Sequence, residues 1–465
     1  MSPTSYQTAP PRDTGEDAPA ADRAGRGEGA IIGVAPSCVK GFRNRRSPGS
    51  IPREGAGTKF VCRSSLMRRF LLILLLATGA NASTLPGFRV QLLQGVPQFV
   101  TSLAVDSKGT LYYATKSGDI FRFGVPETAI GAGSVVAHVA TDASGNSGLI
   151  GLALRDDNTA IVHYTTPRQT YDVVSRIDLA TAAETEIHRF VCDKDVAERG
   201  CSDEHHGGNL TLAPDGSIFL GIGDYGAPLL APDPAWNAGK VWRILPDGTV
   251  VQFARGFRNP FDLAWDAATQ RVILADNGES VDDEIDVVAQ GDDCGWPYTA
   301  GNKTAVPGTR APIYSFPVVV APTGLAPLSG RNPILRRGYL LASYVTKALY
   351  YVPDVYAQPV PDPVAVIQGE TDPIIDVVEA PNGIIYFATG FGIYRLTVPL
   401  PGDCNGDGVV DAADIAALGK ELSGGAHPMT SSHASWGCDA NRDGTIDARD
   451  LAALAAMVRV RSVRH

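Results

Sequence analysis

Apolar runs separated by short polar turns fill the chain between Ser102 and Leu396. Six segments repeat one pattern, in which an apolar strand, a turn and a second apolar strand follow one another, and most turns are built on Asp, Asn or Gly. The segments are Ser102–Phe123, Leu149–Leu179, Leu210–Ile244, Leu263–Val288, Gly324–Val352 and Ile375–Leu396, of which the fifth is the least regular. Strands that flank such turns form β-hairpins.

Hairpins that recur at about 45–60 residues are typical of β-propeller blades, and six copies predict six blades. The 50 Gly and 33 Pro among 465 residues also favour many short strands. The alternative is a pair of β-sandwiches, whose strands follow one another at shorter spacing. We therefore expect a mainly β protein with a six-bladed propeller over residues 85–398. The loops on one face of a propeller converge on its central channel, where a functional site is expected.

The composition changes to Asp, Ala and Gly after a linker at residues 399–402. Two twelve-residue loops, 403–414 and 439–450, place oxygen donors at positions 1, 3, 5, 9 and 12 and Gly at position 6, with a helix after each loop. The side-chain donors are Asp403, Asn405, Asp407, Asp411, Asp414, Asp439, Asn441, Asp443, Asp447 and Asp450, and position 7 offers the carbonyls of Val409 and Thr445. A small α-helical domain that binds two calcium ions is predicted over 403–460. The alternative is an acidic, solvated tail.

Both loops carry Asp at position 12, where ordinary EF-hands have Glu. This duplicated variant at a chain end resembles the dockerin type I domain. The resemblance implies a cohesin-like protein partner, contacted through loop positions 10 and 11. Those positions hold Ala412-Ala413 and Ala448-Arg449, without the hydroxyl pair common in cellulosomal dockerins.

Residues 67–82 have the organisation of a secretory signal peptide, with Met67-Arg68-Arg69, an apolar run and Ala80-Asn81-Ala82 before Ser83. The alternative is a buried apolar segment, and the run is too short to cross a bilayer. We expect translation to start at Met67, with residues 1–66 a disordered extension or a misannotated start. The protein is then secreted or periplasmic. Its formal net charge of −10 argues against nucleic-acid binding.

An exported chain meets oxidising conditions, in which cysteines pair. After removal of the signal peptide five cysteines remain: Cys192, Cys201, Cys294, Cys404 and Cys438. Cys192 can pair with Cys201 and Cys404 with Cys438, which leaves Cys294 as a buried thiol. The sequence alone does not fix these pairs.

Several motifs occur in one order along the predicted strands: Glu204-His205-His206-Gly207-Gly208-Asn209-Leu210, Pro214-Asp215-Gly216, Arg258-Asn259-Pro260, Asp282-Asp283-Glu284-Ile285 and Gly295-Trp296-Pro297. Together they resemble the soluble quinoprotein glucose dehydrogenase and aldose sugar dehydrogenase family, over about residues 88–398. The resemblance implies a six-bladed propeller that uses pyrroloquinoline quinone (PQQ) to oxidise a sugar hydroxyl. The alternative function is a non-catalytic propeller of the same lineage that binds carbohydrate or protein.

The resemblance also implies residue roles. His205 is the catalytic base, Glu204 is an acidic neighbour that orients it, and His206 falls at a variable position. The cofactor residues are Arg258, Asn259 and Asn146, and the calcium ligands are the carbonyls of Gly278 and Glu279.

For each of these residues there is also an alternative interpretation without a functional role. His205 can be a surface imidazole, Arg258 can brace a loop, and the carboxylates after Glu279 can cap a loop. The chain also departs from the family. Where the family pattern reads Arg-x-Arg-Asp-Val, this chain has Pro373-Ile374-Ile375-Asp376-Val377, and Lys347 is the nearest candidate for the cofactor lysine.

Overall fold

The computed structural model describes residues 83–84, 88–124, 133–192, 204–301, 306–332, 334–398, 400–405, 409–425, 427–428, 436–443 and 445–462. The expected signal peptide, the segment before it, Cys201 and the loop residue Asp407 lie outside these ranges. None of the helices described there is long and apolar enough to cross a membrane.

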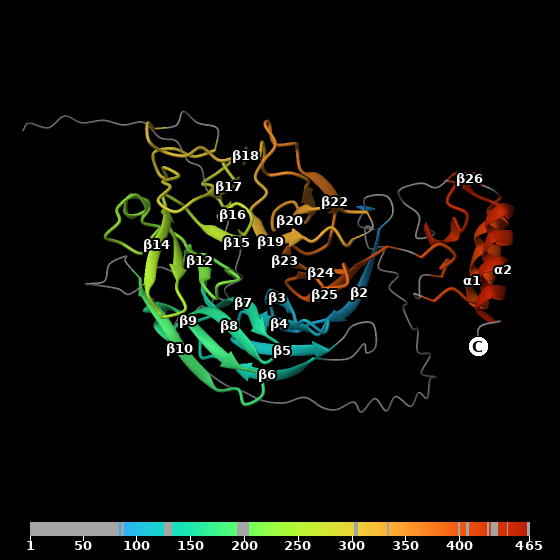
Figure 1. Ribbon diagram of the computed structural model, residues 1–465, viewed down its shortest axis with the longest axis horizontal. Coiled ribbons are helices and arrows are strands. Elements are labelled where there is room, and N and C mark those ends of the chain that lie inside the picture. The colour runs from blue at the N-terminus through green and yellow to red at the C-terminus, as the bar shows by residue number, and fades with distance from the viewer. Residues whose placement is uncertain are drawn as a thin grey trace, which may run out of the picture. The chain divides into compact units, whose positions relative to one another are not determined.

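Six antiparallel sheets form a propeller (Figure 1). The first blade has β3 (Val100–Val105), β4 (Leu111–Thr115), β5 (Asp119–Gly124) and β6 (Ser134–His138), and the second has β7 (Leu149–Asp156), β8 (Thr159–Thr165), β9 (Tyr171–Asp178) and β10 (Glu184–Val191). The third has β11 (Leu210–Leu212), β12 (Ile218–Ile222), β13 (Lys240–Ile244) and β14 (Val250–Arg255). The fourth has β15 (Pro260–Asp266), β16 (Arg271–Asp276), β17 (Glu284–Val288) and β18 (Tyr314–Ser315).

The fifth blade has β19 (Pro322–Leu328), β20 (Gly338–Ser343), β21 (Leu349–Val352) and β22 (Val364–Gln368), with β1 (Ser83–Thr84) paired outside β22. The sixth has β23 (Ile374–Glu379), β24 (Ile385–Thr389) and β25 (Gly392–Thr397). Its outer strand is β2 (Arg89–Gly95), from the start of the propeller. Pairing of β2 with β25 joins the two ends of the propeller in one sheet and closes the ring.

The six-bladed prediction is confirmed, because each repeated segment supplies strands of one blade. The first strands of the blades, β3, β7, β11, β15, β19 and β23, contact one another in a ring and surround a central channel. Apolar clusters fill the spaces between neighbouring blades, as between Leu152 of β7 and Ala114 of β4. The β-sandwich alternative is excluded by this closed arrangement.

Polar side chains, two of them buried, tie the inner strands together across alternate blade boundaries. The carboxylate of Asp262 accepts the Leu325 N–H at 2.6 Å, and that of Asp376 accepts the Leu103 N–H at 2.6 Å. The side-chain oxygen of Asn209 accepts the N–H of Leu152 at 3.1 Å. Burial raises the pKa of Asp376 to about 7 and, together with the charge of Asp376, raises that of Asp262 well above its usual value. These contacts satisfy backbone groups that would otherwise be unpaired in the channel.

The C-terminal module has two helices, α1 (Ala412–Glu421) and α2 (Ala448–Ser462), and one short strand pair, β26 (His427–Pro428) with β27 (Thr445–Ile446). Asp411 and Asp414 form a capping box at the start of α1. The module also has the short 3-10 helices η3 (Leu422–Gly424) and η4 (Trp436–Cys438), whereas η1 (Pro167–Gln169) and η2 (Pro228–Leu230) belong to the propeller. The predicted helical character of this module is confirmed.

The cysteines follow the expected pattern where they are described. Cys404 and Cys438 form a disulfide in the C-terminal module. Cys192 is also disulfide-bonded, and its expected partner Cys201 lies outside the described residues. Cys294 is a buried free thiol.

Candidate functional site

A cavity of about 460 Å³ lies where loops that precede the inner strands converge. It brings together all but one of the propeller residues predicted for the site: Asn146, His205, Arg258, Asn259, Gly278 and Glu279. These residues come from loops that are far apart in the sequence, as expected for a propeller face. Glu204 is exposed and is not among the residues that line the cavity.

His205 is held by a carboxylate that the sequence analysis missed. Its Nδ1 lies 2.6 Å from Oδ1 of Asp224, and the two side chains are 14% and 1% exposed. Asp224 Oδ2 accepts the indole N–H of Trp296 at 2.9 Å, and Oδ1 accepts the N–H of Gly226 at 2.8 Å. A carboxylate on Nδ1 fixes the tautomer of a histidine and leaves Nε2 as the basic nitrogen. This geometry suits a general base that faces the cavity.

Asp224, and not only the adjacent Glu204 that the sequence suggested, is a carboxylate that can orient His205. Glu204 is an exposed residue, and its role stays a prediction. A usable signal for Asp224 was present, since Gly223-Asp224-Tyr225-Gly226 directly follows the fully apolar, buried strand β12. Because β12 runs antiparallel to the inner strand β11, residues directly after β12 lie at the same face as the loop that precedes β11.

Arg258 and Asn259 are held by a buried carboxylate at the end of β16. Asp276 accepts the backbone N–H of Arg258 at 2.9 Å and that of Asn259 at 2.6 Å. The guanidinium of Arg258 donates to the carbonyl of Asn277 at 3.1 Å and lies 5.9 Å from the ring centre of Trp296. The side-chain oxygen of Asn259 accepts the N–H of Gly207, which links this turn to the His205 loop. The turn thus fixes a cation beside the candidate base.

The loop at residues 277–283 is closed by Asp283. One of its carboxylate oxygens accepts the N–H of Gly278 at 2.9 Å, and the other accepts those of Val320 and Ala321 at 2.7 Å. A Cβ at Gly278 would lie 2.3 Å from the carbonyl carbon of Asp282, so only glycine fits there. Asp283 thus has the loop-capping role that the sequence allowed. Gly278 and Glu279 lie at the cavity, and their role as calcium ligands stays a prediction.

A cluster of three carboxylates lies in the fourth blade, where Asp276, Glu284 and Asp286 have ligand atoms within 4.8 Å of one another. Neither carboxylate oxygen of the fully buried Asp286 has a hydrogen-bond partner among the described residues. Burial, together with the neighbouring carboxylates, raises the pKa of Glu284 to about 10 and that of Asp286 well above its usual value. Such a group can hold a hard divalent cation. Of its members, only Glu284 belonged to a motif quoted from the sequence.

The lining of the cavity offers groups that fit a planar anionic quinone. Arg258 and Lys116 supply cations, although Lys116 also donates to the carbonyl of Gly145, and Asn146, Asn259 and Asn277 supply amides. Phe99, Ile150 and Phe261 supply apolar surface for ring faces. The lining also includes Ile375, where the family pattern has an arginine, whereas Lys347 does not line the cavity and donates to the carbonyl of Thr371 at 2.6 Å. The cavity therefore offers fewer cations to a tricarboxylate than the family pattern does.

The two C-terminal loops close in the same way at position 12. Asp414 accepts the N–H groups of Asn405 and Asp411, and Asp450 accepts those of Asn441 and Asp447, at 2.8–3.1 Å. Both carboxylates are fully buried. Of the remaining predicted ligands, Asp403 and Asp439 are buried, Val409 is exposed, and Asp443 and Asp447 pair with Arg449. The repeated geometry supports the paired-loop reading.

The chain matches known proteins in both parts. Residues 100–392 match the model of the glucose/sorbosone dehydrogenase family, and residues 401–459 match that of the dockerin type I domain. Quinoprotein glucose dehydrogenase B of Acinetobacter calcoaceticus is 26% identical over 230 residues, which are 40% of this chain and 47% of that protein.

Solved structures share the propeller fold. PQQ-bound aldose sugar dehydrogenase of Streptomyces coelicolor has a TM-score of 0.57 at 22% identity, covering 68% of this chain and 99% of that one. The apo-form of the soluble aldose sugar dehydrogenase of Escherichia coli has a TM-score of 0.57 at 18% identity, covering 67% and 99%. The chain belongs to the glucose/sorbosone dehydrogenase family and carries a dockerin type I domain after its propeller.

Proposed function

We propose that the propeller oxidises a sugar hydroxyl, with His205 as the base that removes the hydroxyl proton. The observation that carries this proposal is the His205–Asp224 pair at the cavity, with the cation of Arg258 also lining it. The proton passes from the sugar oxygen to Nε2, and the buried carboxylate of Asp224 stabilises the imidazolium that forms. The carbon-bound hydrogen leaves with its electron pair toward an acceptor in the same cavity.

PQQ is the proposed acceptor, since the aldose sugar dehydrogenase of Streptomyces coelicolor, which shares this fold, has been solved in a PQQ-bound form. Arg258, Lys116 and Asn259 would pair its anionic groups, and the carbonyls of Gly278 and Glu279 would hold an accompanying calcium ion. When bound, the quinone supplies a two-electron oxidant. The remaining steps belong to the protein, which orients the sugar and takes its proton.

A non-catalytic propeller is the second candidate, and the apolar part of the lining favours it. Ile375, Val319 and Tyr344 line the cavity, and none of them supplies a cation for a trianion. A neutral sugar with an apolar ring face can bind against such a lining without any cofactor. This reading predicts sugar binding without turnover.

Reconstitution separates the two candidates. The apo protein is mixed with PQQ and calcium, binding is followed by calorimetry, and dye reduction is assayed with a panel of aldoses. The proposed function requires reduction that depends on both PQQ and sugar. Sugar binding without dye reduction, in a sample that has taken up PQQ, would support the non-catalytic reading instead.

Ile375→Arg is expected to tighten PQQ binding by about tenfold or more, because a charged hydrogen bond to a carboxylate is worth ~1.5–3 kcal/mol. Ile375 is buried and lines the cavity, so the guanidinium of an arginine at this position would extend into the space proposed for the quinone. Calorimetric Kd values measure the effect, with Ile375→Met as the uncharged control. Equal Kd values for the two variants would show that the quinone does not contact this part of the lining.

We also propose that the protein is exported and uses its dockerin to bind a cohesin-like partner, while the propeller acts on a sugar. The mature chain is expected to begin at Ser83, after cleavage behind Ala82. Mass spectrometry of secreted or periplasmic material measures the first residue. Peptides from before Met67 in that material would contradict the expectation.

A further inference from the structure

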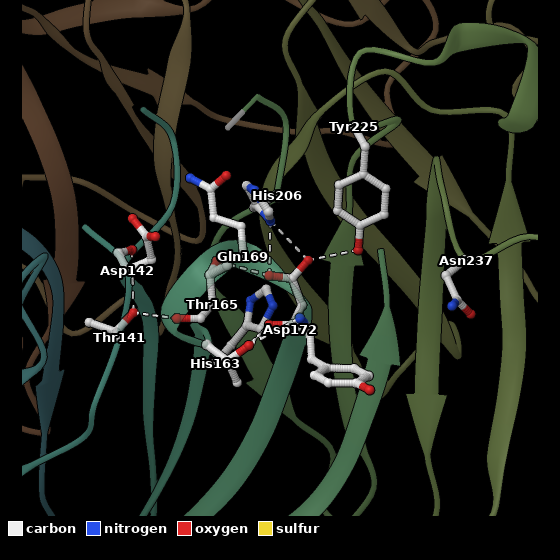
Figure 2. Close-up of polar contacts among 12 residues, drawn as sticks. Thr141, Asp142, His163, Thr165, Gln169, Asp172, His206, Tyr225 and Asn237 are labelled. Atoms are coloured by element: carbon white, nitrogen blue, oxygen red, sulfur yellow. Dashed lines mark hydrogen bonds and ion pairs between the residues drawn. The ribbon is translucent and has the colours of Figure 1, made fainter. Parts of the chain in front are cut away.

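A second buried polar cluster is centred on Asp172 of β9 and includes His206 and Tyr225 (Figure 2). His206 Nδ1 lies 2.9 and 3.0 Å from the two oxygens of Asp172, and the hydroxyl of Tyr225 donates to the same carboxylate at 2.7 Å. The Thr165 hydroxyl on β8 also donates to Asp172, at 2.9 Å. All four side chains are fully buried.

The members of this cluster are sequence neighbours of the candidate base and its carboxylate. His206 follows His205, and Tyr225 follows Asp224. The backbone of His205 has φ +51° and that of Tyr225 has φ +53°. Left-handed conformations at residues other than glycine cost free energy and persist only where surrounding contacts enforce them. The Asp172 cluster supplies such a contact to both turns.

The electrostatics agree with a charged, well-satisfied carboxylate. Burial alone would raise the pKa of Asp172, but the charge of His206 and the hydrogen bonds from His206 and Tyr225 lower it. His163, also buried, has its Nδ1 2.8 Å from the carbonyl of Gly208 in the His205 loop. The sulfur of Cys192 is within 4.8 Å of the ligand atoms of Asp172 and His206, but it is disulfide-bonded and offers no thiolate to a metal.

We infer that Asp172 is a positioning residue for the reaction. One buried carboxylate of the second blade holds the two turns that carry His205 and Asp224, and thereby sets the geometry of the imidazole–carboxylate pair. The inference rests on the proposed role of His205 for its effect on turnover. Its structural content, that the Asp172 contacts fix the His205–Asp224 hydrogen bond, holds with or without turnover.

Tyr225→Phe tests the inference with the loss of a single hydroxyl. Small displacements of a reacting group lower rates strongly, so kcat is expected to fall on the order of tenfold to a hundredfold with little change in KM. The matched control is Thr165→Val, which removes a hydrogen bond to the same Asp172 from within the second blade. It leaves the contacts of His206 and Tyr225 in place. The two variants are expected to lose similar thermal stability, while Thr165→Val keeps kcat within about twofold of the wild type.

A readout that needs no turnover is the ¹⁵N chemical shift of the two ring nitrogens of His205 in the apo protein, assigned with His205→Ala. These shifts report the tautomer and the hydrogen bond to Asp224. They are expected to move in Tyr225→Phe and to stay unchanged in Thr165→Val. Unchanged His205 shifts in Tyr225→Phe would overturn the inference. If the wild type oxidises no sugar, the proposed function fails, and the nitrogen shifts still decide whether Asp172 positions His205.

Discussion

His205→Ala is expected to lower the kcat of aldose oxidation by about 10²–10⁴-fold, since this is the usual contribution of a general base. PQQ binding should remain largely intact, because the base acts on the sugar and Arg258 and Asn259 are held by a separate carboxylate, Asp276. Steady-state dye reduction measures kcat, and calorimetry measures the Kd of the quinone.

The matched control is Glu204→Ala at the preceding position. Glu204 is exposed and does not line the cavity, so this variant is expected to keep wild-type kcat. Equal loss of activity from the two changes would mean that the loop, rather than the imidazole, matters. His206 is a poor control, because it is fully buried on Asp172 and its truncation would disturb the core.

Removal of calcium is expected to unfold the C-terminal module over residues 403–460 and to leave the propeller folded. The apolar core of the module is small, with Val410, Leu418, Ile446 and Leu454 among its buried residues. A domain of this size with so small a core is only marginally stable even with its disulfide, and its clustered carboxylates repel one another without a cation. Metal-binding free energy then becomes folding free energy. Circular dichroism of the full chain with and without chelator should show lost helical signal and retained β signal.

The ligand assignment predicts a finer result within the module. Asp414→Ala should abolish calcium uptake by the first loop only, because Asp414 lies at the closing position of that loop and Asp450 at that of the second. Calorimetry is expected to measure one calcium ion fewer per chain for the variant than for the wild type, whose C-terminal module binds two. No calcium uptake by the wild type, or identical dichroism with and without chelator, would contradict the paired-loop account.

The repeated strand–turn–strand pattern was enough to predict six blades, because blade hairpins are local in sequence. Ring closure was not predicted. The strand that completes the sixth blade, β2, precedes the first repeat and pairs with β25 about 300 residues later. Nothing in the local pattern of residues 89–95 identifies such a distant partner.

The site was predicted only in part, because its motifs are local in sequence and several of its contacts are not. His205, Arg258 and Asn259 belong to motifs, and the structure brings them to one cavity. Asp224 and Asp172 were missed because their contacts cross between loops and blades, 19 residues away for the His205–Asp224 bond and 34 for His206–Asp172. Glu204 was chosen for its adjacency in sequence, which does not determine the direction of its side chain.

The most direct measurement of the central claim is a single turnover of the reconstituted protein without external acceptor. Protein loaded with PQQ and calcium is mixed anaerobically with an aldose, and the oxidised sugar is quantified per bound quinone. The account predicts about one oxidised sugar per quinone for the wild type and none on the same time scale for quinone-loaded His205→Ala. Equal product from both proteins, or none from a wild type shown to hold the quinone, would contradict it.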